Sequence, residues 1–163
     1  MEDLRIQILE LLKENSKIPV EDMAKMLDQD VEVIEEAIRA MEEDGTIIKY
    51  STVINWEKAS DEQVVAMIDV KVAPKRGQGF DALAERIYRF PEVQSVYLMS
   101  GGYDLSVIIE GKNLKQVANF VSARLSPLED VVSTTTHFIL KKYKENGVIL
   151  HEKNEDCRLV ISP

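Results

Sequence analysis

The chain has 163 residues, a formal net charge of −9 and 45% hydrophobic residues. These values indicate one or two small globular domains and exclude a disordered chain or a basic protein that coats nucleic acid. No apolar run is long enough to span a membrane, and no basic segment followed by an apolar core stands at the start, so we expect neither membrane insertion nor export. One cysteine, Cys157, and two distant histidines, His137 and His151, give no internal disulfide and no metal-ligand spacing. We therefore expect a cytoplasmic protein without a metal site or a cofactor.

The excess of acidic residues lies in the first third of the chain. Residues 1–60 contain 7 Lys and Arg against 15 Asp and Glu, a net charge of −8. Residues 61–163 contain 13 against 14, a net charge of −1. The first third is therefore the part in which charge opposes binding to nucleic acid.

Residues 1–55 have the pattern of three helices followed by a strand. Apolar residues repeat at helical spacing in three runs, residues 4–12, 23–27 and 31–41. A turn at residues 28–30 separates the last two runs, and Asp30 is placed to cap the third helix. Thr46 to Ile54 reads as a strand. This order is the outline of a winged helix-turn-helix, a DNA-binding module.

Residues 63–144 have the order βαββαβ. The strands are expected at residues 64–72, 93–98, 105–110 and 131–143, and the helices at residues 80–88 and 114–125. This is the order of the ferredoxin-like fold, in which two helices cover one face of a four-stranded antiparallel sheet. The fold class is therefore α+β, and residues 56–62 are expected to link the two domains.

The C-terminal tail, residues 145–163, contains two short apolar runs, Val148–Leu150 and Leu159–Ile161. They are expected either to form a hairpin across residues 151–156, added to the edge of a sheet, or to serve as an arm at an interface. The sequence leaves both interpretations open.

The segment Met99–Leu105 reads Met-Ser-Gly-Gly-Tyr-Asp-Leu and lies between two expected strands, so it should turn a β-hairpin. Its paired glycines leave backbone amides uncovered beside the hydroxyl of Tyr103 and the carboxylate of Asp104. The amides suit a carboxylate and Asp104 suits an ammonium group, so the turn suits a small zwitterion. The alternative is a tight turn in which Asp104 only caps the backbone.

Several motifs in both parts of the chain resemble those of one family, the Lrp/AsnC (feast/famine) transcription regulators. In the first part the matching residues are Ile8, Leu9, Leu12, Met23, Ala24, Ile34, Ile38, Met41, Glu42, Gly45, Ile47 and Tyr50. In the second part they are Val96-Tyr97, Gly101–Leu105, Val131-Val132 and Ser133–Thr136. The resemblance implies a DNA-binding first domain and a second domain that binds an amino acid or a similar small metabolite. It also implies a homo-oligomer in which dimers assemble into tetramers or octamers.

The resemblance places the ligand near the hairpin turn and the last strand. The residues that it implies are Ser100, Gly101, Gly102, Tyr103, Asp104, Thr134 and Thr136. Thr134 and Thr136 share a face because successive strand residues alternate, and Thr135 is expected to point away. The alternative is a strand whose threonine hydroxyls bond only to neighbouring strands.

The third helix departs from the family's pattern, in which arginines commonly flank its central apolar residue. Here Glu36 and Ala37 precede Ile38, and Arg39 follows it. Residues 30–44 contain seven acids and one base, a local charge of −6 that opposes entry into the major groove. The expected DNA-contacting residues are Lys17, Lys25, Gln29, Glu32, Val33, Glu36, Arg39 and Lys49.

We therefore predict a regulator of transcription that binds specific sites in double-stranded DNA and responds to an amino acid or a similar small metabolite. One alternative is a metabolite-sensing oligomeric scaffold whose helix-turn-helix contacts protein instead of DNA. Another is an enzyme similar to the sirohaem decarboxylases, which would need basic and histidine side chains around a tetrapyrrole. Neither histidine lies at a convincing pocket position, so we assign no catalytic residue.

Overall fold

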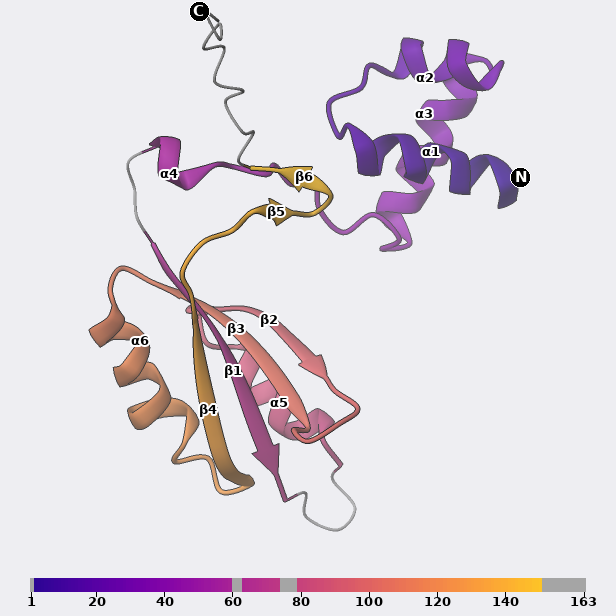
Figure 1. Cartoon of the computed structure of the whole chain (residues 1–163). Helices are drawn as coiled ribbons and strands as arrows, with labels where there is room; N and C mark the ends of the chain where they lie inside the picture. The colour runs from indigo at the N-terminus through magenta and orange to yellow at the C-terminus, as the bar shows by residue number, and fades with distance from the viewer. Residues whose placement is uncertain (1, 60–62, 74–78, 151–163) are drawn as a thin grey trace, which may run out of the picture. The chain divides into compact units, whose positions relative to one another are not determined.

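The computed structural model describes residues 2–59, 63–73 and 79–150. The chain forms two compact units, Met1–Ile54 and Asn55–Pro163 (Figure 1). Among the described residues, no helix is both long and apolar enough to cross a membrane.

The N-terminal unit consists of three helices, α1 (Glu2–Glu14), α2 (Val20–Leu27) and α3 (Val31–Glu43). They enclose a small core whose buried members are Ile8, Met23, Ala24, Ile34 and Met41. These residues belong to the apolar runs of the sequence, and the three predicted helices are confirmed. Asp28, at the C-terminal end of α2, takes a left-handed conformation (φ 52°), which turns the chain toward α3.

Two details of this unit differ from the sequence predictions. Asp30 stands at the N-cap of α3, but its side chain makes no capping hydrogen bond, and its carbonyl accepts from the backbone N–H groups of Val33 and Ile34 instead. The predicted strand over Thr46–Ile54 is wrong, because Thr46 and Ile47 lie in a bend after α3 and residues 48–54 have no regular secondary structure. A strand needs a partner, and the described residues of this unit otherwise form helices.

The C-terminal unit contains the ferredoxin-like order of strands and helices, as predicted. Its main elements are β1 (Val64–Val72), α5 (Asp81–Tyr88), β2 (Val93–Leu98), β3 (Leu105–Gly111), α6 (Leu114–Phe120) and β4 (Val131–Ile139). The sheet has the order β2-β3-β1-β4 with every pair antiparallel. Helix α6 continues into a π-helical turn, Val121–Leu125.

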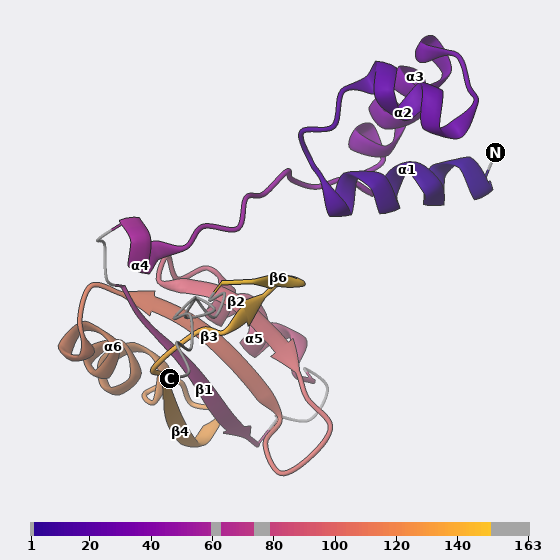
Figure 2. The same ribbon diagram turned by 45° about the horizontal axis from the view of Figure 1, so that its top comes forward.

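The core of this unit lies between the sheet and its two helices (Figure 2). Ile68, Val70 and Val107 from the sheet pack against Ile87 of α5 and Phe120 of α6. Residues that stand opposite each other in an antiparallel pair share a face. The other face therefore carries the intervening residues Met67, Asp69, Lys71, Tyr97, Ile108, Thr135, His137 and Ile139, and we call it the open face.

The last strand is shorter than predicted and ends at Ile139 instead of Tyr143. Ile139 stands opposite Val65, next to the first residue of β1, so the chain beyond it leaves this sheet. A short helix, α4 (Trp56–Ala59), lies in the predicted linker.

A small hairpin follows the sheet in the C-terminal unit. Strand β5 (Lys144–Glu145) pairs with β6 (Val148–Ile149) across Asn146 and Gly147, both at positive φ (47° and 86°). The Asn55 amide donates a hydrogen bond to the Leu150 carbonyl at 3.0 Å. The first apolar run of the tail thus pairs with residues 144–145, whereas the second run, Leu159–Ile161, lies outside the described residues.

Candidate functional site

The turn between β2 and β3 is the predicted hairpin. The Met99 N–H donates to the Asp104 carbonyl at 2.8 Å and closes the turn over residues 100–103. Gly101 has φ +154°, where other residues are strained, and a Cβ added at Gly101 or Gly102 would meet nothing within 4 Å. Within the part of the chain that the structure describes, the backbone N–H groups of residues 100–103 have no acceptor, so they can donate to an anionic ligand.

The Asp104 carboxylate is partly buried and held by two donors. Its Oδ2 accepts from the Val72 N–H at 2.8 Å, and the Lys71 Nζ lies 3.2 Å from Oδ2 and 3.3 Å from Oδ1. The Val72 N–H, and after it Lys71, hold the pKa of Asp104 below its ordinary value, although burial opposes the shift. The pairing between β1 and β4 shifts register between Lys71 and Val72. The Val72 N–H that donates to the Asp104 carboxylate lies at this irregularity.

Tyr103 reaches across the open face to the last strand. Its hydroxyl lies 2.8 Å from the Thr135 Oγ1. Thr135 stands opposite Asp69, whose Oδ2 lies 3.2 Å from the His137 Nε2. Hydroxyl, carboxylate, ammonium and imidazole groups are therefore gathered at the turn end of this face.

One part of the threonine prediction, the direction in which Thr135 points, is wrong. Thr134 and Thr136 do share a face, but they stand opposite Val70 and Ile68, whose side chains are in the helix-covered core. The Thr134 Oγ1 lies 3.5 Å from the Ser126 Oγ, at the start of the loop that leads into β4. Thr135, which was expected to point away from Tyr103, is the threonine that contacts it.

Sequence reasoning also missed Lys71 as a member of the site. The alternation of β1 contained the signal, because buried Ile68, Val70 and Val72 imply that Asp69 and Lys71 point to the opposite face. Which turn residue meets which strand residue depends on the register between strands, and one chain's local pattern does not specify that register.

The candidate DNA surface consists of the exposed side of α3, the turn before it and three lysines outside them, Lys17 between α1 and α2, Lys25 on α2 and Lys49 after α3. All eight residues predicted to contact DNA are exposed. Two of them have local partners, because Lys25 pairs with Asp22 at 3.4 Å and the Gln29 amide donates to the Asp28 carbonyl at 2.9 Å. The first two turns of α3 present Glu32, Glu35 and Glu36 without an ion-pair partner among the described residues.

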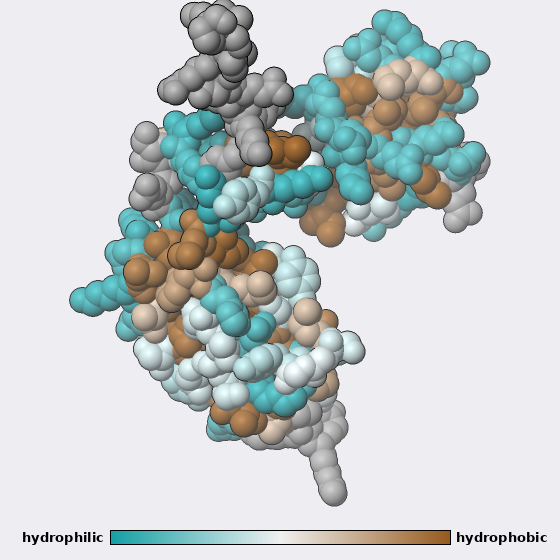
Figure 3. All heavy atoms as spheres, viewed as in Figure 1, coloured by the Kyte–Doolittle hydropathy of each residue, from teal (hydrophilic) through white to brown (hydrophobic). Residues whose placement is uncertain are grey.

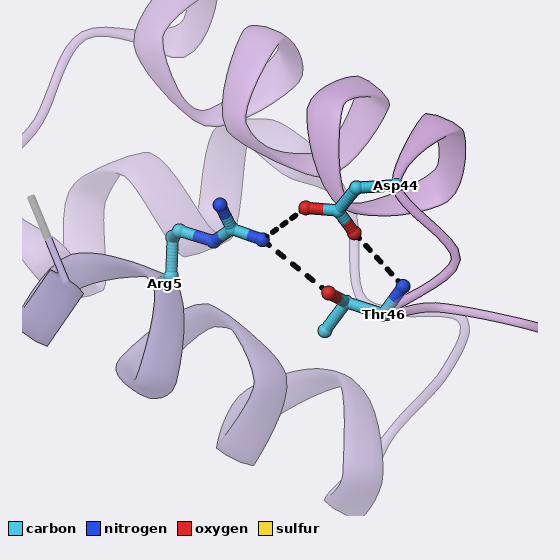
Figure 4. Close-up of polar contacts among 3 residues, drawn as sticks. All are labelled: Arg5, Asp44 and Thr46. Atoms are coloured by element: carbon cyan, nitrogen blue, oxygen red, sulfur yellow. Dashed lines mark hydrogen bonds and ion pairs between the residues drawn. The ribbon is translucent and has the colours of Figure 1, made fainter.

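Two of the three acids at the other end of α3, Asp44 and Glu42, have partners within the fold, and Figure 4 shows those of Asp44. The Arg5 Nη2 donates to the Asp44 Oδ2 at 2.5 Å and to the Thr46 Oγ1 at 3.4 Å, and the Thr46 N–H donates to the Asp44 Oδ1 at 2.9 Å. The Thr46 hydroxyl, the Arg5 guanidinium and the Thr46 N–H lower the pKa of Asp44 to about 2. Asp44 therefore joins α1 to the end of α3 and is a structural residue.

A second acid of α3 is also engaged. The Tyr50 hydroxyl donates to the Glu42 Oε1 at 2.8 Å. Burial, and after it the Glu42 carboxylate, raises the pKa of Tyr50. Among the described residues, the acids of α3 whose carboxylates have no partner are therefore Glu32, Glu35 and Glu36 in its first two turns and Glu43 in its last turn.

The two units define a class of protein, a regulator with a helix-turn-helix domain joined to a ferredoxin-like domain. Residues 1–48 match the family model of the winged helix-turn-helix DNA-binding domain, and residues 65–149 match that of the Lrp/AsnC ligand binding domain. The chain belongs to the Lrp/AsnC family and is a DNA-binding transcriptional regulator with a ligand-binding domain.

Similar proteins agree with this assignment. The chain is 56% identical over 158 residues to the HTH-type transcriptional regulator YugG of Bacillus subtilis, covering 96% of this chain and 95% of that protein. It is 32% identical over 145 residues to the HTH-type transcriptional regulator FL11 of Pyrococcus furiosus, covering 89% and 93%. A transcriptional regulator of Neisseria meningitidis in complex with L-methionine shares the fold, with a TM-score of 0.71, 19% identity and coverage of 89% and 93%. Relatives named as regulators support a role other than catalysis.

Proposed function

We propose that this protein regulates transcription at specific DNA sites in response to an amino acid or a similar small metabolite bound at the β2–β3 turn. The observation that carries the proposal is the group of Lys71, Tyr103, Asp104 and Thr135 beside uncovered amides in a domain of the ligand-binding family. The amides suit a carboxylate, and Asp104 with the two hydroxyls suits an ammonium group. The carboxylate and the ammonium group of an amino acid would thus both have hydrogen-bond partners at this turn.

The open face supports a homo-oligomer. Met67, Tyr97 and Ile139 are exposed on it, and Leu140 beyond the end of β4 is 94% exposed. Figure 3 shows apolar residues gathered at the end of the sheet where β4 leaves it. We propose that a second copy covers these side chains, and that dimers assemble further so that several helix-turn-helix units contact one DNA.

The proposal is tested by selection of bound fragments from random double-stranded DNA, with and without the twenty amino acids; L-methionine, bound by the Neisseria regulator, is also tested alone. We expect a two-fold symmetric motif whose enrichment changes with the amino acids, because paired modules read symmetric sites. Absence of any enriched motif from a folded oligomer would contradict the proposal. It would favour the second candidate, a sensor whose helix-turn-helix contacts protein.

The unpaired acids of α3 are the observation that favours this second candidate, and they give a direct test. If α3 enters the major groove, Glu32→Gln with Glu36→Gln should tighten non-specific DNA binding about tenfold at low salt, because two carboxylates no longer face phosphates. The matched control is Glu10→Gln with Glu14→Gln on α1, which removes the same charge from exposed positions elsewhere in the unit. Equal DNA affinities of the two variants, measured by fluorescence anisotropy, would mean that α3 does not face DNA.

A further inference from the structure

The two oxygens of the Asp104 carboxylate have different partners. Oδ2 accepts the Val72 N–H at 2.8 Å and also lies near the Lys71 ammonium. Oδ1 has the Lys71 Nζ, at 3.3 Å, as its partner among the described residues. The backbone donor therefore fixes the carboxylate, and the second oxygen faces an ammonium group that belongs to the protein itself.

The lysine is the more exchangeable of the two donors. Its side chain is 42% exposed whereas that of Asp104 is 19% exposed. Ion pairs this open to solvent contribute little net stability, because water screens them and the long side chain loses freedom. The Val72 N–H belongs to a buried strand residue and does not move independently of β1.

We propose that Lys71 occupies the position of the effector's ammonium group and is displaced when an amino acid binds. The inference rests on the proposed function, because it assumes that the effector binds at the β2–β3 turn. In the free protein Lys71 neutralises Asp104 and keeps the site closed to other cations. An amino acid replaces the lysine ammonium at Oδ1 with its own, and the Tyr103 hydroxyl lies on the same face as a further acceptor.

The same geometry predicts that Lys71 weakens the binding of an amino acid and strengthens the binding of the matching 2-oxo acid, which differs from it in one group. A 2-oxo acid has no ammonium, so it leaves Lys71 in place and its oxygens accept from the lysine. Removing the lysine should therefore favour the amino acid and disfavour the matching 2-oxo acid. A purely structural lysine would change both affinities in the same direction.

The experiment is calorimetric titration of the full chain with each of the twenty L-amino acids and, for those that bind, the matching 2-oxo acid. Lys71→Met keeps the length and apolar stem of the side chain and should bind the amino acid about fivefold tighter than the unaltered protein, and the 2-oxo acid more weakly. Lys71→Arg keeps the charge and should remain close to the unaltered protein. Lys115→Met, at an exposed position of α6, is the control for loss of one positive charge.

Equal or weaker binding of the amino acid by Lys71→Met, with melting temperatures showing that it is folded, would overturn the inference and leave the proposed function standing. A parallel change in both ligands would also overturn it. If no variant binds any amino acid, the effector class of the proposed function fails and this inference fails with it.

Discussion

Two aspartates of this protein, Asp44 in the N-terminal unit and Asp104 in the C-terminal unit, are held in similar ways and serve different purposes. Each accepts a backbone N–H and contacts a basic side chain, and each has a lowered pKa. Each also lies close to a glycine at positive φ, Asp44 directly before Gly45 (+75°) and Asp104 three residues after Gly101 (+154°). A lowered pKa therefore does not by itself separate a structural carboxylate from a binding one.

What separates them is the second oxygen and the surroundings. Both Asp44 oxygens are taken, one by Arg5 and one by the Thr46 N–H (Figure 4). The Oδ1 of Asp104 accepts only from the Lys71 ammonium among the described residues. Asp104 also lies beside uncovered turn amides and the hydroxyl pair of Tyr103 and Thr135. Exposure alone would select the wrong residue, since the side chain of Asp44 is 44% exposed and that of Asp104 is 19% exposed.

The largest expected effect is on amino-acid affinity, and it should appear when the carboxylate of Asp104 is neutralised but not when that of Asp44 is. Asp104→Asn keeps an acceptor for the Val72 N–H but loses the negative charge, so amino-acid affinity should fall at least about thirtyfold, as expected for loss of a charge-assisted hydrogen bond. Asp44→Asn removes the same charge and should leave that affinity unchanged. Calorimetric titration of both variants measures the difference, and equal affinities would contradict the assignment of Asp104 to the site. Alanine is less informative at Asp104, because it would also leave the Val72 N–H without its acceptor.

The sequence was sufficient to predict most helices and strands, because the spacing of apolar residues that indicates them lies within each segment. Helical spacing in residues 4–41 and alternation in residues 64–72 specify which faces are buried, and the structure confirms these elements. The predicted strand over Thr46–Ile54 failed because a strand depends on a partner that local propensity does not supply. The grouping of Tyr103 with Thr135 and of Asp104 with Lys71 depends on register between strands distant in sequence, so only part of the site was predictable.

The two glycines provide the next test of the comparison. Gly45→Ala and Gly101→Ala should each destabilise their unit by about 1 kcal/mol, because alanine is strained at these φ values. Only Gly101→Ala should weaken amino-acid binding, since the turn amides shift with it. Gly45→Ala is the matched control for binding, because it carries comparable backbone strain and lies in the unit without the ligand site. Urea denaturation and titration measure the two effects, and a Gly101→Ala variant that is destabilised but binds the amino acid as well as Gly45→Ala would show that the turn amides do not hold the ligand.

The smallest expected effect concerns the pH dependence of the N-terminal unit. The pKa of Asp44 is lowered from 3.8 to about 2, so its contacts stabilise the folded state above pH 3.8, and this contribution is lost as the pH falls through about 2. Asp44→Asn should therefore melt at a lower temperature than the unaltered protein at neutral pH, and the difference should close near pH 2. The effect should be modest because Arg5 and Asp44 are both partly exposed. Helical circular dichroism of the full chain at a series of pH values measures it, with Asp3→Asn on α1 as the control for loss of one negative charge. A difference that is the same at neutral pH and at pH 2 would mean that the charge of Asp44 does not hold α1 to the end of α3.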